Sequence, residues 1–114
     1  MNSVKREILK KIPIKSDQEF KILVWLVILG SKAPKNRIKI ISLLRKNPFN
    51  TNQISTSLHL DYKVVERHLE TMVEKNLLKN TGKKYGAMYF LSPTLTENLE
   101  LFDNLISKIR SKKN

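Results

Sequence analysis

Between residues 62 and 70 the chain carries side chains that form hydrogen bonds and ion pairs, interrupted by apolar residues at regular steps. The polar members are Tyr62, Lys63, Glu66, Arg67 and Glu70. A phenol, an ammonium group, carboxylates and a guanidinium donate and accept hydrogen bonds, but none is an activated nucleophile. This set is suited to recognising a polar partner rather than to transforming a substrate.

No other group of residues forms a catalytic or metal-binding pattern. The chain has no cysteine, and His59 and His68 stand nine residues apart without carboxylates that would complete a metal site. Three glycines leave little room for a phosphate-cradling loop or a nucleophile elbow. We therefore expect neither an enzyme nor a bound cofactor or metal, and we expect structural roles for both histidines.

Two closely spaced helices must position the polar set. Asn50 or Thr51 can cap the first helix, and Gln53 follows Asn50 by three residues, as in a capping box. Asp61 can cap the second helix, and Asn76 is a residue type that ends helices in left-handed backbone. The apolar residues of the second helix recur at steps of four, three and one, at Val65, Leu69, Met72 and Val73. This spacing predicts that they face the core and that the polar set faces outward.

A short hairpin is predicted after the second helix. Residues 77–93, LLKNTGKKYGAMYFLSP, contain two strand-prone runs around a tip where Asn80 and Gly82 supply backbone freedom. Lys79, Lys83 and Lys84 lie at or near the tip, and residues 77–92 contain no acidic side chain. The order of elements predicts a mainly α fold with a small cationic β-hairpin wing.

These segments resemble the winged helix-turn-helix regulators of the arsenic-repressor (ArsR-like) type, especially their archaeal branch. The resemblance spans residues 36–93 and rests on NRIKIISLL, NTNQISTSLHLDYKVVERHLETMVEKNLL and YGAMYFLSP. It implies a further helix over residues 36–47, which closes a trihelical core, and a dimeric DNA-binding protein. Because the chain lacks the thiolates of the metal-responsive members, the metal-sensing role is not carried over.

Carried over residue by residue, the resemblance places four side chains toward the major groove of DNA: Tyr62, Lys63, Glu66 and Arg67, with Val64 and His68 at the margins. The planar fork of Arg67 suits the two acceptors of a guanine, and Lys63 suits a guanine or a phosphate. Glu66 suits cytosine, and an ion pair with Lys63 is an equal alternative. Contacts to the DNA backbone are expected from the helix start at Asn50, Thr51, Asn52 and Gln53.

The distribution of charge along the chain indicates which elements contact the phosphates of DNA and which make selective contacts. The chain has 22 basic and 10 acidic residues and a net charge of +12, which favours a polyanion such as nucleic acid or an anionic membrane surface. Residues 50–76 sum to −1, whereas residues 77–92 sum to +3 and residues 17–49 to +5. We therefore expect phosphate contacts from the wing, the N-terminal arm, Lys35, Arg37 and Lys39, and more selective contacts from the helix pair. For any single lysine, solubility is an equally good explanation.

Residues 17–29, DQEFKILVWLVIL, contain eight consecutive apolar residues before Gly30 and Pro34, a run too short to cross a bilayer. We expect a helix covered on several sides, with Trp25 as a core or interface anchor, and a buried strand is the alternative. The first residues lack the apolar stretch and cleavage site of a secretory signal. We therefore expect a cytoplasmic, nucleoid-associated protein.

Residues 94–110 show the spacing of a coiled-coil seam. Apolar residues recur at intervals of four, three, four and three, at Leu95, Leu99, Phe102, Ile106 and Ile109. We expect a homodimer that uses this seam and Trp25. The alternative is a long amphipathic helix packed on its own domain.

One domain with extensions is expected from a chain of 114 residues. We expect residues 1–16 to form a basic arm or helix, residues 17–93 the winged helix-turn-helix domain with its leading apolar helix, and residues 94–114 a C-terminal dimerisation helix with a basic tail. The expected function is sequence-specific binding of double-stranded DNA by a dimeric transcription regulator, a repressor on a palindromic operator. The alternatives are a winged-helix protein-interaction module and a non-specific nucleic-acid-binding architectural protein.

Overall fold

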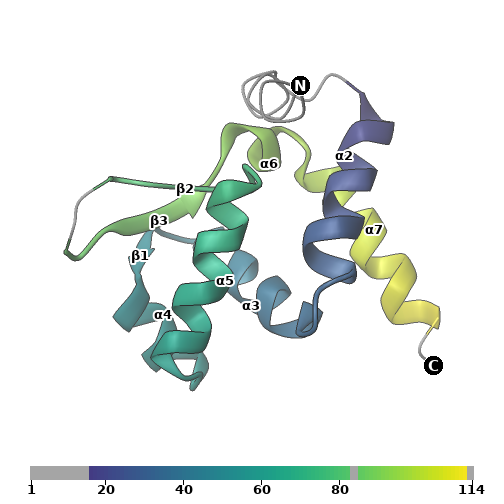
Figure 1. Cartoon of the computed structure of the whole chain (residues 1–114). Helices are drawn as coiled ribbons and strands as arrows, with labels where there is room; N and C mark the ends of the chain where they lie inside the picture. Colours follow the sequence, from purple (N-terminus) through teal and green to yellow (C-terminus); the bar gives the residue numbers. More distant parts are fainter. Residues whose placement is uncertain (1–15, 83–84, 113–114) are drawn as a thin grey trace, which may run out of the picture.

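The computed structural model describes residues 16–82 and 85–112, so the expected N-terminal arm lies almost wholly outside the described residues. The chain runs through α2 (Asp17–Val24), the π-helical turn η1 (Trp25–Leu29), α3 (Pro34–Leu44), β1 (Phe49–Asn50), α4 (Thr51–Leu58), α5 (Tyr62–Glu74), β2 (Leu78–Asn80), β3 (Met88–Leu91), α6 (Pro93–Glu97) and α7 (Leu99–Lys112). The wing projects on the side of α4 and α5, and α2 and α7 lie at the other end of the molecule (Figure 1). The mainly α architecture with a small wing is confirmed.

Local capping sets the helix-turn-helix as predicted. The Asn50 side chain accepts from the Gln53 amide at 2.8 Å, and the Gln53 side chain accepts from the Asn50 amide at 2.9 Å. Asp61 accepts from the Val64 amide at 3.2 Å and caps α5. Between the helices His59 adopts left-handed backbone, with a φ of 55°. The reversal therefore needs only the residues between Leu58 and Tyr62.

Asn76 ends the second helix in left-handed backbone, with a φ of 63°, which confirms the predicted stop. The Leu77 amide donates to the Met72 carbonyl at 2.9 Å and closes the last turn. Leu77 and Leu78 are then fully buried, so the chain enters the wing through the core.

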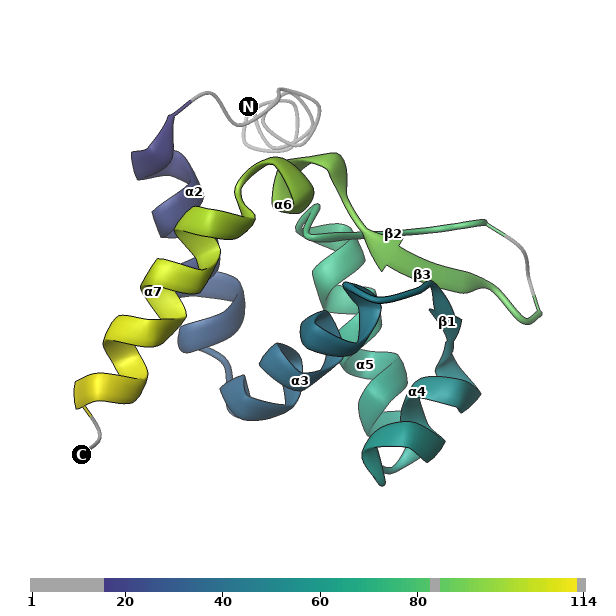
Figure 2. The ribbon, with the colours of Figure 1, turned by 180° about the vertical axis from the view of Figure 1, so that it is seen from behind.

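The sheet has a third strand that the sequence analysis did not predict. Its order is β1-β3-β2, with Phe49 opposite Tyr89 in one antiparallel pair and Lys79 opposite Phe90 in the other. β1 is only two residues long, so it shows no period-two pattern. It ties the start of α4 to the wing, as the two views show (Figure 1, Figure 2).

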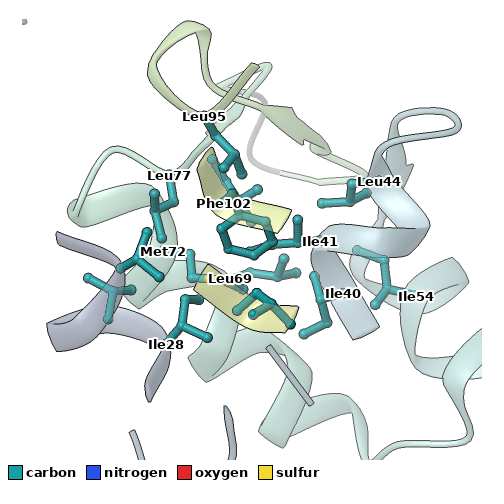
Figure 3. Close-up of a cluster of buried hydrophobic side chains, with 14 of the residues drawn as sticks. Ile28, Ile40, Ile41, Leu44, Ile54, Leu69, Met72, Leu77, Leu95 and Phe102 are labelled. Carbon is teal, nitrogen blue, oxygen red and sulfur yellow. The ribbon is translucent and has the colours of Figure 1, made fainter. Parts of the chain in front are cut away.

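One hydrophobic core joins the helix-turn-helix to the flanking helices. Phe102 of α7 lies within the cluster beside Ile41 of α3, with Leu69 of α5 close by (Figure 3). The fully buried members of this core also include Phe20 and Val24 of α2. The leading and trailing helices are therefore parts of the same packed unit.

The leading helix is covered on one side only within this chain. Phe20, Val24 and Ile28 are buried, but Trp25 is 61% and Leu26 72% exposed. With Ile22, these two residues form what we call the exposed ridge. Trp25 is therefore not a core anchor. No described helix is long and apolar enough to span a membrane.

The C-terminal region differs from the prediction of one helix with a free seam. It breaks at Asn98 between α6 and α7, where Asn98 ends α6 and its carbonyl accepts from the Phe102 amide at 2.8 Å. Leu95, Phe102 and Ile106, expected at a dimer interface, are buried in the chain's own core. Leu99 and Ile109 are half-buried. Intramolecular packing wins because this stripe also completes the core of a small domain.

Candidate nucleic-acid interface

A polar hollow of about 410 Å³ separates the helix-turn-helix from the wing. One wall comes from the start of α4 and from α5, and the other from the wing. We call it the wing hollow, and its lining residues are Asn50, Thr51, Asn52, Tyr62, Glu66, Asn80, Gly82, Gly86, Ala87 and Tyr89. The structure thus brings Tyr62 and Glu66 together with the predicted backbone contacts at residues 50–52.

The outward face of α5 carries the remaining predicted base-reading residues. Lys63 and Arg67 are exposed, on the side of the helix away from the buried Val65 and Leu69. The Lys63 ammonium lies 3.8 Å from a carboxylate oxygen of Glu66, so the alternative ion pair for Glu66 is present. Both groups are on the surface, and such a pair is weak enough to open for another partner.

The side chains at the start of α4 are not equally free to contact the DNA backbone. Those of Asn50 and Gln53 are engaged in the capping box. Thr51 is 8% exposed and is hydrogen-bonded to the Tyr89 side chain. Asn52 is exposed and lines the wing hollow. A phosphate at this helix start would therefore meet Asn52 and the helix dipole before it met the other three side chains.

Tyr89 is a site residue that sequence reasoning missed, since it was taken only as part of a strand. Burial raises the pKa of its phenol, and the carboxylates of Glu70 and Glu66 raise it further, while the hydrogen bond with Thr51 opposes them. The phenol therefore stays protonated at the wall of the wing hollow. Its position follows from the β1–β3 pairing, which local pattern does not reveal.

The wing presents Lys79, which is exposed on β2. Its turn is shaped by Asn80, whose side chain accepts from the Gly82 amide at 2.8 Å, and by Gly82 and Gly86 in left-handed backbone. Lys83 and Lys84 lie outside the described residues. Their place at the tip stays a prediction.

The expected phosphate contact at Arg37 is wrong, because its guanidinium is engaged inside the fold. Its Nη1 donates to the Val27 carbonyl of η1 at 2.6 Å, and its Nε donates to Nδ1 of His68 on α5 at 2.9 Å. Burial lowers the pKa of Arg37. Burial, followed by the charges of Arg37 and Arg67, lowers the pKa of His68. His68 is thus the neutral acceptor that joins α5 to α3, and not a margin of the reading face.

The other two predicted phosphate contacts on α3 lie away from the wing hollow. Lys35 and Lys39 line a separate groove with Trp25 and Ile109. Within residues 16–82 and 85–112, no group of three His, Cys, Asp or Glu side chains could hold a metal ion. The polar chemistry around α5 is therefore that of hydrogen bonding and charge.

The fold and this interface define a winged helix-turn-helix protein. Residues 34–80 match the family model described as "Bacterial regulatory protein, arsR family", a match that covers less than half of the chain and runs from α3 to β2. The segment that carries the helix pair is therefore similar in sequence to that family. No curated protein matches the sequence significantly.

Solved structures of similar fold support this class. HlyU from Vibrio cholerae is 19% identical with a TM-score of 0.62, over 81% of this chain and 97% of that one. The homodimeric winged helix-turn-helix DNA-binding domain of Mb0332 from Mycobacterium bovis is 13% identical with a TM-score of 0.60, over 90% and 96%. The AntR antimony-specific transcriptional repressor is 16% identical with a TM-score of 0.57, over 89% and 90%. At these identities the likeness establishes the fold, and the winged helix-turn-helix prediction is confirmed.

Proposed function

We propose that this protein is a sequence-specific double-stranded DNA-binding transcription regulator. The observation that carries the proposal is the exposed polar face of α5, with Lys63 and Arg67, beside a wing that bears Lys79. A helix of this kind fits the major groove, and a neighbouring ribbon meets the phosphates that flank it. The match of residues 34–80 to the arsR family model supports the same function.

The low net charge of the helix pair, residues 50–76, favours sequence-specific binding of DNA over purely electrostatic binding. Residues 50–76 sum to −1 although the chain sums to +12, so phosphate attraction must come from other elements. Arg67 is the strongest candidate for reading a base, because its guanidinium is exposed and has the two-pronged geometry that guanine accepts. Glu66 and Tyr62, which line the wing hollow, are our candidates for contacts with the neighbouring bases.

We further propose a homodimer that acts on a palindromic operator in the cytoplasm and represses by occupying a promoter. The exposed ridge of Ile22, Trp25 and Leu26 supplies an uncovered apolar surface for the second copy. The Mb0332 domain, of similar fold, is described as homodimeric, and AntR as a repressor. The archaeal affiliation stays a prediction.

Selection from a pool of randomised duplexes tests the function. We expect enrichment of a palindrome whose half-sites are about one helical turn apart, roughly 34 Å between centres. Changing one base pair in a half-site should then weaken binding by about 1–3 kcal/mol. Tight binding without enrichment would indicate an architectural protein, and no salt-sensitive duplex affinity would indicate a protein-interaction module.

A further inference from the structure

An apolar groove is lined by residues of η1, α3 and α7. In the ribbon, α7 lies at the end of the molecule opposite to the wing (Figure 2). Its walls are built from Trp25 and Leu29 of η1, Ile38 of α3, and Ile106 and Ile109 of α7. Its volume is about 330 Å³, at the lower end of the range for small-molecule sites, roughly 300–1,000 Å³. We call it the α3–α7 groove.

The groove has charge of one sign. Lys35 and Lys39 lie one turn apart on α3 and line it together, and no acidic side chain lines it among the described residues. Neither lysine takes part in any of the ion pairs found in the described part of the chain. An apolar floor with two ammonium groups is complementary to an apolar chain that ends in an anion.

We propose that the α3–α7 groove binds a small amphipathic carboxylic acid. The apolar chain lies against Trp25, Ile38 and Ile109, and the carboxylate is held between Lys35 and Lys39. A methylene group is comparable in size to a water molecule, whose share of liquid volume is about 30 Å³, so the groove takes on the order of ten heavy atoms. The proposed ligand is therefore a medium-chain acid or one of similar size.

A second copy of the chain is a poorer occupant of this groove. The surface that this chain offers to a second copy is the exposed ridge, whose side chains are apolar and supply no anion to meet the two lysines. Leu26, the most exposed member of the exposed ridge, does not line the groove. The ridge and the groove share only Trp25, which allows the two surfaces to be tested separately.

The wall formed by η1 is a second observation that favours a binding site. A π-helical turn is rare and occurs frequently at functional sites. Here the Gly30 amide donates to the Trp25 carbonyl at 2.7 Å, and this bond closes the turn between the two groove residues Trp25 and Leu29. The altered helical repeat leaves Trp25 61% exposed at the groove edge while Val27 and Ile28 enter the core.

Decanoate is a suitable probe, and Trp25 is a site-specific reporter because it is the only tryptophan. The full chain without DNA is titrated with decanoate below its micelle concentration, with decanol as the uncharged counterpart. We expect a saturable shift of Trp25 emission to shorter wavelength with decanoate, as the indole loses water. Lys35→Gln with Lys39→Gln should weaken decanoate binding about three- to tenfold and leave decanol binding unchanged.

Two control variants separate charge at the groove from charge elsewhere and from dimer formation. Lys21→Gln with Lys108→Gln removes the same charge from exposed positions outside the groove and should leave decanoate affinity unchanged. Leu26→Glu should also bind decanoate normally, since Leu26 lies outside the groove.

No saturable shift, or equal weakening by both lysine pairs, overturns the proposal. Loss of the decanoate shift in Leu26→Glu, whose substituted position lies outside the groove, would assign the signal to the exposed ridge and overturns the proposal as well. Because no DNA is present, these outcomes are independent of the proposed DNA-binding function.

Discussion

Two arginines show how differently one residue type can be used in a small domain. Arg67 is exposed on α5, whereas Arg37 bridges Val27 of η1 and His68 of α5 through two hydrogen bonds. Composition counts both as positive charge available to DNA. Only the structure shows that Arg37 is engaged in holding three elements together, so of the two only Arg67 is available for the proposed contact with a base.

Replacing Arg67 by alanine should relax base preference at one position of each half-site. Discrimination there should fall by about 1–3 kcal/mol, because a two-pronged contact to guanine is lost while the fold keeps its exposed helix face. Binding to single-base variants of the selected duplex measures this directly. The control Lys21→Ala removes a charge from α2, at the end of the molecule away from the wing, and should change no base preference. A uniform loss of affinity across all duplexes from Arg67→Ala would mean that Arg67 contacts only phosphate.

His68 should make stability depend on pH. Its folded-state pKa lies below the usual 6.5 because burial and the charges of Arg37 and Arg67 disfavour the imidazolium. The unfolded chain therefore binds this proton more tightly, so the contribution to stability is complete above about pH 6.5 and is lost as pH falls through the folded-state pKa. Urea unfolding from pH 8 to pH 5 should show this loss.

The His68→Gln variant should lack that pH-dependent step, since glutamine accepts a hydrogen bond from Arg37 but does not titrate. His59→Gln is the matched control, because His59 is exposed in the turn and should leave the step in place. Identical pH dependence in the wild type and in His68→Gln would show that His68 does not control the step.

At the scale of elements, the wing and α5 should contribute to DNA binding in separable ways. Lys83→Ala with Lys84→Ala should weaken binding to all duplexes and flatten the salt dependence by up to about two units, because phosphate contacts carry that slope. Lys21→Ala with Lys108→Ala removes equal charge from the end of the molecule away from the wing and should have a smaller effect. Equal slopes for the two double variants would contradict a wing that contacts phosphates.

The junction between α5 and α6 depends on one buried hydroxyl. Ser92 is fully buried, donates to the Asn76 carbonyl at 2.8 Å and accepts from the Leu95 amide at 3.1 Å. Ser92→Ala should lower the free energy of unfolding by about 1–3 kcal/mol, since it removes both the donor to the part-buried Asn76 carbonyl and a helix cap. Urea unfolding measures the change. Ser57→Ala, at an exposed position of α4, should cost far less.

The elements that were predictable from the sequence are those specified by neighbouring residues. Asn50, Asp61 and Asn76 mark helix ends through bonds and backbone angles that span only a few positions, and the structure has each as predicted. The outward face of α5 followed from helical spacing in the same way. Such features depend on local chemistry that the printed sequence contains.

The features that were missed depend on contacts between distant positions. β1 forms only because β3 pairs with it, and Tyr89 reaches the wing hollow through that pairing. Arg37 and His68 are 31 residues apart, so nothing in the sequence around either one indicates the bond. The stripe from Leu95 to Ile106 had the right spacing for a seam, but spacing does not tell whether the partner is a second chain or the same core.

For the molecule as a whole, packing changes which surface is available for a dimer. Removing residues 94–114 would take away the buried side chains of Leu95, Phe102 and Ile106 and expose the rest of the core that they cover. Truncation therefore tests stability rather than association. The uncovered apolar surface is the exposed ridge on α2 and η1, where Leu26 has 72% of its surface exposed. A dimer formed there would join the ends of the molecules that lie away from the wings (Figure 1).

Leu26→Glu should therefore convert a dimer into a folded monomer. The side chain makes few contacts within the chain, so the fold is kept, but a carboxylate in an apolar interface is costly to desolvate. Light scattering should show half the mass, and affinity for a palindrome should fall about 100-fold or more, because the second half-site no longer adds to the first. Gln18→Glu places the same charge on an exposed position of α2 and should leave both quantities unchanged. An unchanged mass for Leu26→Glu would exclude the exposed ridge as the dimer surface. If the variant is a monomer but its affinity for the palindrome is unchanged, each chain reads its half-site alone.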